Sequence, residues 1–255
     1  MRPIYLDAHA TTPCDPRVVA AMHPYWTEHF GNPSNPEHAF GHEAGEAVER
    51  ARRQIADLLN AKPKEIVLTS GTTESNHLAS LGAVLANGTK RHVVTARTEH
   101  KAILGPVSIL QEAGTDVTWL GTDAEGRIDP QDLRRALRPD TALVSLMHAN
   151  NEIGTIHPIA EFAKIAHEAG ALFHTDAAQT VGKEPLDVRA LDVDLVSFSA
   201  HKNYGPKGVG ALFIRERTPR IKLRPPMLGG GQEKGLRPST QAVPLIVGMG
   251  EAMRI

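Results

Sequence analysis

Hydrophobic positions along residues 64–215 follow two patterns that take turns along the chain. Short apolar runs, typical of buried strands, are separated by longer segments whose apolar positions recur every three or four residues, as in helices. The runs predict strands at 65–70, 92–96, 116–121, 142–149, 171–179, 194–200 and 210–215, and the intervening segments predict helices at 74–87, 101–114, 130–138 and 158–170. This alternation indicates an α/β fold: a mostly parallel seven-stranded sheet with helices on both faces. The last two strands, joined by a Gly/Pro turn, are expected to be antiparallel.

The segments on either side of this repeat are less regular. They predict a strand-like arm over 1–13, a helix from Asp15 to about Trp26, a turn segment at 31–36, a helix at 42–60, a loop rich in Gly, Pro and basic residues after 215, and a helix that starts near 242. We therefore expect an N-terminal arm (1–15), one large domain (16–250) and the start of a connection to a further domain (251–255).

Composition narrows the class of protein. Hydrophobic residues make up 41% of the chain, charged residues 22%, and the net charge is −1. These values are ordinary for a soluble globular protein and exclude a broadly basic surface for nucleic acid or anionic membrane. We find no apolar run long enough for a transmembrane helix and no signal-peptide pattern at the N-terminus. The single cysteine, Cys14, rules out an internal disulfide framework and favours a cytoplasmic location.

Polar side chains follow five of the predicted strands. In an open parallel sheet, ligands bind beyond the carboxyl ends of the strands, so these side chains are expected to share one edge. They are the turn Gly71-Thr72-Thr73, His100, the amides Asn150 and Asn151, the pair Asp176 and Gln179, and the group Ser199, His201 and Lys202.

Lys202 lies between a predicted strand and a rigid turn that contains Gly205, Pro206 and Gly208. A lysine held in a fixed place suits Schiff-base chemistry. The alternative is a solvated lysine in a β-hairpin. The Gly71 turn also has two interpretations, a phosphate-binding helix N-terminus or a simple helix cap.

One ligand would use all of these groups. A phosphorylated aromatic aldehyde would condense with Lys202 and place its ring nitrogen on Asp176, and its ring would serve as an electron sink. The remaining groups would bind the phosphate (the Gly71-Thr72-Thr73 turn, Ser199, His201), the ring oxygen (Asn151, Gln179) and the ring face (His100). The predicted cofactor is pyridoxal 5′-phosphate.

Metal binding is the competing interpretation of the thirteen histidines. The candidate ligands are His148, His174, Asp176 and His201. The sequence contains neither HExxH nor the Cys/His spacing of a zinc site, so we expect no metal. The segment GGGQEKG is likewise not a dinucleotide fingerprint, because no strand-to-helix turn surrounds it.

The ordered motifs resemble those of the cysteine desulfurases, which are class V, fold-type-I pyridoxal-phosphate enzymes. The motifs that carry the resemblance span nearly the whole chain: YLDAHATTP, FGNPSNPEHAFG, IVLTSGTTESN, TEHKAIL, VSLMHANNEIGTIHPI, FHTDAAQTVGK, SFSAHKNYGPKGVGAL and GGGQEKGLRPST. The resemblance implies conversion of L-cysteine to L-alanine, with the sulfur held as a persulfide and passed to an acceptor or scaffold protein for iron–sulfur cluster or thio-cofactor assembly.

The resemblance also implies a role for each site residue. Lys202 would be the Schiff-base lysine, His100 would stack on the ring as an acid/base, and Thr240 would reach the phosphate of the other subunit in a homodimer. Asp176 would pair with the ring nitrogen, Gln179 and Asn151 would contact the ring oxygen, and Thr73, Ser199 and His201 would hold the phosphate.

Two features depart from the family pattern. Ser239 stands where the family usually has glycine. The family chain continues beyond Ile255 into most of the small domain, a substrate-binding arginine and the cysteine nucleophile, so we expect a truncated and impaired enzyme. Cys14 cannot be assumed to replace that nucleophile, and a small residue packed in a loop is its simpler interpretation. The alternatives are another class V aminotransferase or lyase, and a non-catalytic subunit that only binds cofactor and dimerises.

Overall fold

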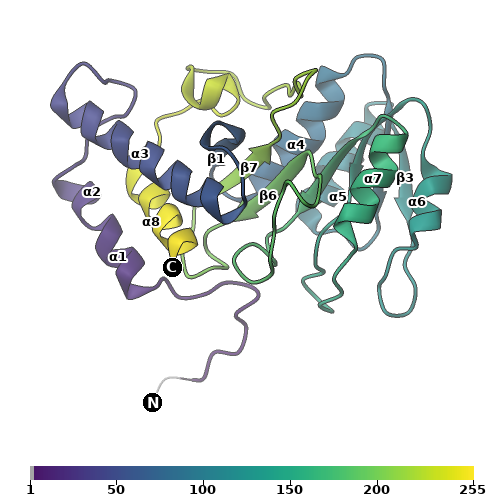
Figure 1. Cartoon of the computed structure of the whole chain (residues 1–255), viewed down its shortest axis with the longest axis horizontal. Helices are drawn as coiled ribbons and strands as arrows, with labels where there is room; N and C mark the ends of the chain where they lie inside the picture. Colours follow the sequence, from purple (N-terminus) through teal and green to yellow (C-terminus); the bar gives the residue numbers. More distant parts are fainter. Residues whose placement is uncertain (1–2) are drawn as a thin grey trace.

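The computed structural model describes residues 3–255 and contains one seven-stranded sheet (Figure 1). The strand order is β1-β7-β6-β5-β4-β2-β3. Strands β6, β5, β4, β2 and β3 run parallel, whereas β7 is antiparallel to both of its neighbours. The predicted fold class and the antiparallel final pair are confirmed. The strands are β1 (Ile66–Thr69), β2 (His92–Ala96), β3 (Asp116–Leu120), β4 (Thr141–Ser145), β5 (Leu172–Asp176), β6 (Leu195–Ser199) and β7 (Gly210–Ile214).

Eight α-helices and two short 3-10 turns accompany the sheet in the described part of the chain. They are α1 (Pro16–Met22), α2 (Pro24–Thr27), α3 (Ala39–Leu58), η1 (Pro63–Glu65), α4 (Thr72–Ala86), α5 (Lys101–Glu112), α6 (Pro130–Ala136), α7 (Ile159–Glu168), η2 (Gln232–Gly235) and α8 (Val243–Arg254). None of the helices within residues 3–255 is long and apolar enough to span a bilayer.

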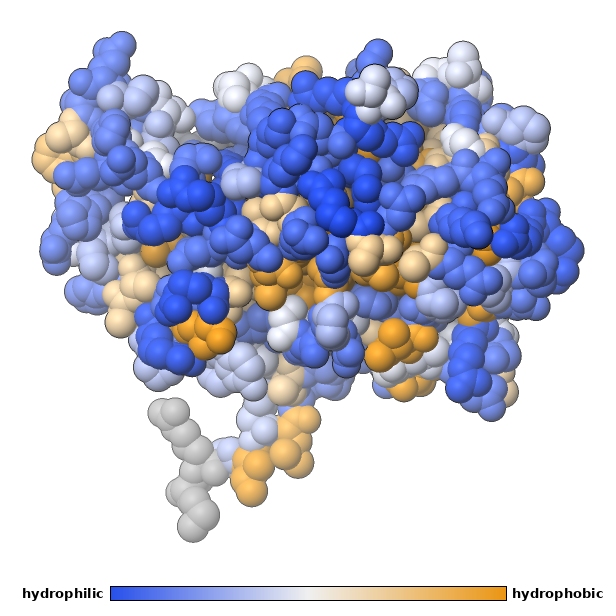
Figure 2. All heavy atoms as spheres, viewed as in Figure 1, coloured by the Kyte–Doolittle hydropathy of each residue, from blue (hydrophilic) through white to orange (hydrophobic). Residues whose placement is uncertain are grey.

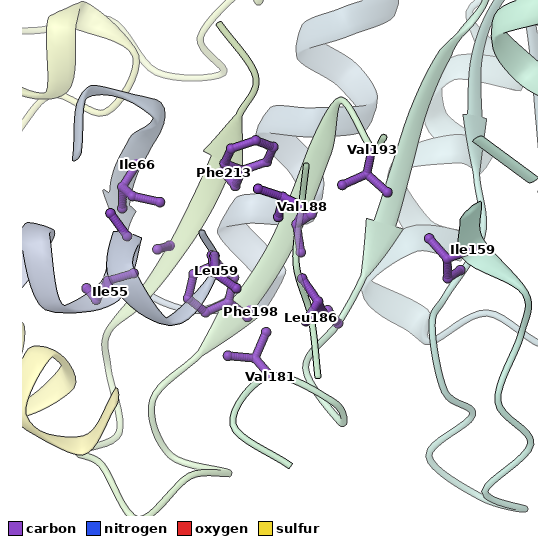
Figure 3. Packing of buried hydrophobic residues seen from close by; sticks show 14 of the residues in the cluster. Ile55, Leu59, Ile66, Ile159, Val181, Leu186, Val188, Val193, Phe198 and Phe213 are labelled. Atoms are coloured by element: carbon purple, nitrogen blue, oxygen red, sulfur yellow. The ribbon is translucent and has the colours of Figure 1, made fainter. Parts of the chain in front are cut away.

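Alternate side chains of each strand enter two separate cores, as the pleat of a strand requires. On β1, Ile66 and Leu68 belong to the larger core, whereas Val67 belongs to the smaller one. The larger core lies under α3, α6, α7 and α8, and Figure 3 shows Ile55, Ile66 and Phe198 among its side chains. The smaller core lies under α4 and α5. Both faces of the sheet are therefore covered, which explains why the strands read as continuous apolar runs.

Two expectations about the N-terminal region were wrong. Residues 3–15 form no strand; the arm leaves the body (Figure 1), and the side chains of Ile4 and Leu6 are 86% and 89% exposed. The arm's apolar side chains stand out below the body in Figure 2. The single helix predicted up to Trp26 is divided into α1 and α2 at His23, because Pro24 has no N–H to donate to the preceding turn.

Helix α3 begins three residues earlier than predicted. The side chain of His38 accepts a hydrogen bond from the backbone N–H of Gly41 (3.1 Å) and so caps the helix. Histidine is a rare cap, and the preferred residues Ser, Thr, Asp and Asn do not occupy this position. The start of α3 was therefore not visible in the sequence pattern.

Candidate functional site

A cleft of about 570 Å³ lies at the edge of the sheet where β1, β2, β4, β5 and β6 end. This volume is in the range of small-molecule sites. The structure brings together eight of the ten predicted cofactor-binding residues in its wall: Thr72, Thr73, His100, Asn151, Asp176, Gln179, His201 and Lys202. The residues that follow these strands therefore lie together in one cleft, as the strand pattern predicts.

Lys202 follows β6 in a tight turn. The backbone N–H groups of Asn203 and Gly205 both donate to the carbonyl of Ala200, at 2.9 and 3.1 Å. A Cβ at position 205 would lie 2.7 Å from the Cβ of Ala200, so only glycine permits this closure. Burial lowers the pKa of Lys202, which favours the neutral amine that a nucleophilic lysine needs.

Asp176 is the last residue of β5 and is held in one orientation. Its Oδ2 accepts from Asn76 Nδ2 (2.7 Å) and its Oδ1 accepts from the backbone N–H of Ala178 (2.9 Å). Burial raises the pKa of Asp176, whereas these two hydrogen bonds and the charges of His100 and Lys202 lower it. A buried carboxylate fixed in this way suits a cationic ring N–H.

The N-terminus of α4 forms one end of the cleft. Gly71 caps this 15-residue helix without a side-chain hydrogen bond, so backbone N–H groups of the first turn are free for a ligand. A Cβ on Gly210 would lie 2.6 Å from Gly71 Cα. The turn at Gly71 can therefore pack against β7 only because residue 210 is glycine. The buried hydroxyls of Thr72 and Ser199 have no hydrogen-bond partner within residues 3–255. Free N–H groups, unpaired hydroxyls and the helix dipole together fit a phosphate.

His100 and Asn151 stand on neighbouring loops of the cleft. His100 caps α5, because its Nδ1 accepts from the backbone N–H of Ala102 (3.1 Å). This contact assigns the proton of the neutral ring to Nε2, which can then donate. The amide of Asn151 donates to Glu152 (3.1 Å) and keeps a second N–H.

The remaining predicted residues differ in their placement. Gln179 lines the cleft and donates from Nε2 to the carbonyl of His9 in the arm (3.0 Å). Ser199 is buried behind the wall and is not itself a lining residue. Thr240 is exposed on the 229–241 loop and does not reach the cleft of its own chain.

The arm and the turn before β7 add residues that the sequence analysis missed. Ala10, Thr11, Lys207 and Val209 also line the cleft. The hydroxyl of Thr11 lies 3.1 Å from His201 Nδ1, and the backbone N–H of Thr12 donates to the carbonyl of His201 (2.9 Å). Two adjacent hydroxyl residues before Pro13 were the available signal, but nothing local in the sequence indicates that the arm returns to the turn after β6.

The histidine-based metal interpretation finds no support at His174. This ring is fully buried in β5, and its two nitrogens lie 2.8 Å from Ser145 Oγ and 2.9 Å from Ser197 Oγ. Burial lowers the pKa of His174 to about 3. Both nitrogens are used within the core, so His174 has none left for a metal.

Ser239 has a backbone φ of +112°, a value that residues other than glycine rarely adopt. We expect Ser239→Gly to raise the free energy of unfolding by about 1 kcal/mol, because it relieves this strain. Ser239→Ala keeps the Cβ and is expected to give no gain. Urea unfolding of the three proteins measures the difference, and equal stability of the glycine and alanine variants would contradict the argument.

Nearly the whole chain is similar in sequence to proteins whose family is known. The family model described as "Aminotransferase class-V" matches residues 4–255. The cysteine desulfurase IscS of Anaeromyxobacter dehalogenans is 56% identical over 99% of this chain, and the mitochondrial cysteine desulfurase of Drosophila melanogaster is 53% identical over all of it. These alignments cover 63% and 55% of the relatives, so the chain spans less than two thirds of their length.

Solved structures show the same similarity in three dimensions. A structure described as a NifS-like protein has a TM-score of 0.95 and 41% identity, over 99% of this chain and 69% of that one. A structure of SspA in complex with cysteine has a TM-score of 0.94 and 43% identity, over 98% and 72%. The shared fold therefore extends over nearly the whole of this chain, including its sheet.

Proposed function

The chain belongs to the class-V aminotransferase family, whose members use pyridoxal phosphate, and on that premise we propose that it is the cofactor-binding part of a cysteine desulfurase. The observation that carries this proposal is the cleft in which Lys202 and Asp176 lie with a helix N-terminus. The relatives named as cysteine desulfurases, and the similar protein solved with cysteine, support L-cysteine as the substrate.

When bound, pyridoxal phosphate supplies an electron sink that stabilises charge at the substrate α-carbon. Lys202 would hold the aldehyde carbon until the amine of the substrate displaces it, and the released neutral amine of Lys202 would then accept the α-proton. Asp176 would keep a proton on the ring nitrogen, and His100 would cover one ring face and move protons through Nε2.

The phosphate end would anchor the cofactor. The backbone N–H groups of Thr72 and Thr73 would donate to phosphate oxygens, with the hydroxyl of Ser199 and the ring of His201 beside them. Asn151 and Gln179 would each offer the second N–H of the amide to the ring oxygen. Thr240, exposed on its loop, would contact the phosphate in a second copy of the chain, so we propose a homodimer.

Sulfur transfer requires an activated thiol. Cys14 is the only cysteine of the 255 residues, and burial together with the neighbouring Asp15 charge raises its pKa. A thiol with a raised pKa is a poor nucleophile near neutral pH. We therefore propose that the persulfide forms on a thiol other than Cys14, before the sulfur passes to an acceptor or an iron–sulfur scaffold protein in a reducing compartment.

The 255-residue chain should therefore bind the cofactor well and turn over poorly. After incubation with pyridoxal phosphate, L-cysteine and a small-molecule thiol, we expect slow formation of alanine that depends on the added thiol. Chromatographic analysis of the products checks this, and Cys14→Ser is expected to behave like the original chain. A keto acid as the main product would favour an aminotransferase, and cofactor binding without any product would favour a non-catalytic subunit.

A further inference from the structure

Glu99 is a buried carboxyl group just behind the cleft wall. Its side chain is 5% exposed, and Oε1 accepts a hydrogen bond from the backbone N–H of Met147 (2.6 Å). Its Oε2 is buried and has no hydrogen-bond partner in the described residues 3–255. An ionised carboxylate with a single partner is costly in such a place, whereas a protonated one is not.

Two hydrogen bonds join the turn after β2 to the loop after β4. One is the bond from Met147 to Glu99, and the other runs from Asn150 Nδ2 to the carbonyl of Thr98 (3.1 Å). His100 follows Glu99 directly, and Asn151 follows Asn150 directly. The spacing of two cleft residues on neighbouring loops therefore depends on a pair of contacts made by Glu99 and Asn150, which are not part of the cleft wall.

The charges around Glu99 favour its neutral form. Burial raises the pKa of Glu99 well above its ordinary value, against the opposing Met147 hydrogen bond, and the negative charge of Asp176 raises it further. Asp176 in turn has its own partners in Asn76 and Ala178 and does not depend on Glu99 for a hydrogen bond. Of the two carboxyl groups, Asp176 has two hydrogen-bond donors of its own and Glu99 has one, so Asp176 is the better placed to carry a negative charge.

We propose that Glu99 is a positioning residue that acts as an uncharged carboxylic acid. It holds the His100 turn and the Asn151 loop at a fixed spacing, and it leaves Asp176 as the single buried negative charge beside the cofactor ring. This inference rests on the cofactor function proposed above, and it assigns to Glu99 a role without contact to substrate or cofactor.

Three variants of the 255-residue chain test the proposal by cofactor titration. Glu99→Gln keeps a carbonyl oxygen for the Met147 N–H and is neutral, so we expect its dissociation constant and absorption band for pyridoxal phosphate to match those of the original chain. Glu99→Ala removes the bond, and we expect about 10-fold weaker binding and a shifted band. Glu161→Ala, at an exposed site of α7, is the matched control and should change neither.

The outcomes separate positioning from a purely structural role. A structural role would lower the melting temperature of the cofactor-free Glu99→Ala protein without shifting the absorption band of the cofactor that binds. Either that result, or a glutamine variant whose dissociation constant rises as much as that of the alanine variant, would overturn the proposal. If the alanine variant does not fold, the glutamine variant decides alone. Failure of the original chain and of Glu161→Ala to bind cofactor would instead refute the proposed function.

Discussion

Replacement of Lys202 by alanine is expected to abolish the visible absorption band of bound pyridoxal phosphate completely. The alanine side chain offers no amine for the cofactor aldehyde, so any remaining binding would be non-covalent. Lys202→Arg is expected to lose the band as well, because the guanidinium keeps the positive charge but stays protonated and cannot act as the amine nucleophile. Absorption spectra of the purified proteins after addition of cofactor provide the measurement.

Lys183 offers a matched control for this experiment. It is an exposed lysine whose pKa is lowered by desolvation and by the charge of Lys202, yet it lies outside the wall of the cleft. We expect Lys183→Ala to retain the full absorption band. A band that persists in both Lys202 variants, or that disappears in Lys183→Ala alone, would show that the cofactor is attached elsewhere.

Glu233→Ala is expected to lower the free energy of unfolding by about 3–5 kcal/mol, because it removes the buried counter-charge of a buried arginine. The side chains of Arg52 and Glu233 are only 10% and 2% exposed, and two hydrogen bonds of 2.8 Å join them. Glu233 also accepts from the backbone N–H of Leu68 (2.9 Å) and from Gln241 Nε2 (2.6 Å). This network fastens the 229–241 loop, which carries Thr240, to α3 and β1.

The same arginine provides the control for this prediction. Glu49 also pairs with Arg52, at 2.9 Å, but its side chain is 54% exposed. We expect Glu49→Ala to cost less than about 1 kcal/mol, since solvent screens an exposed ion pair. Urea unfolding at one fixed protein concentration compares the two variants. Equal losses for Glu49→Ala and Glu233→Ala would contradict the assignment of the buried pair as the main anchor of the loop.

Much of the sheet and of the cleft could be predicted from local pattern. Buried parallel strands must be apolar on both faces, so each strand of the sheet was visible as an apolar run. Ligands bind where parallel strands end, so the residues that follow those runs could be gathered into one site before any coordinate was known. The motifs also indicated a class V pyridoxal-phosphate family, and the family comparison confirms it.

The parts that could not be predicted depend on contacts between distant segments. The return of Thr11 to His201 spans 190 residues, and the pairing of Arg52 with Glu233 spans 181. Neither contact produces a periodic pattern in the sequence, because each is made by a single pair of residues that are far apart along the chain. Glu99 is similar, because in the sequence it is an ordinary charged residue beside a histidine, and only the structure shows that it is buried with a single hydrogen-bond donor.

The most direct test of the account is to locate the covalent attachment of the cofactor. The 255-residue chain would be loaded with pyridoxal phosphate, treated with borohydride to make the bond to lysine permanent, digested and analysed by mass spectrometry. The account predicts a single modified peptide, with the added mass on Lys202. Modification of Lys183, of Lys207 or of several surface lysines, with Lys202 unmodified, would contradict it.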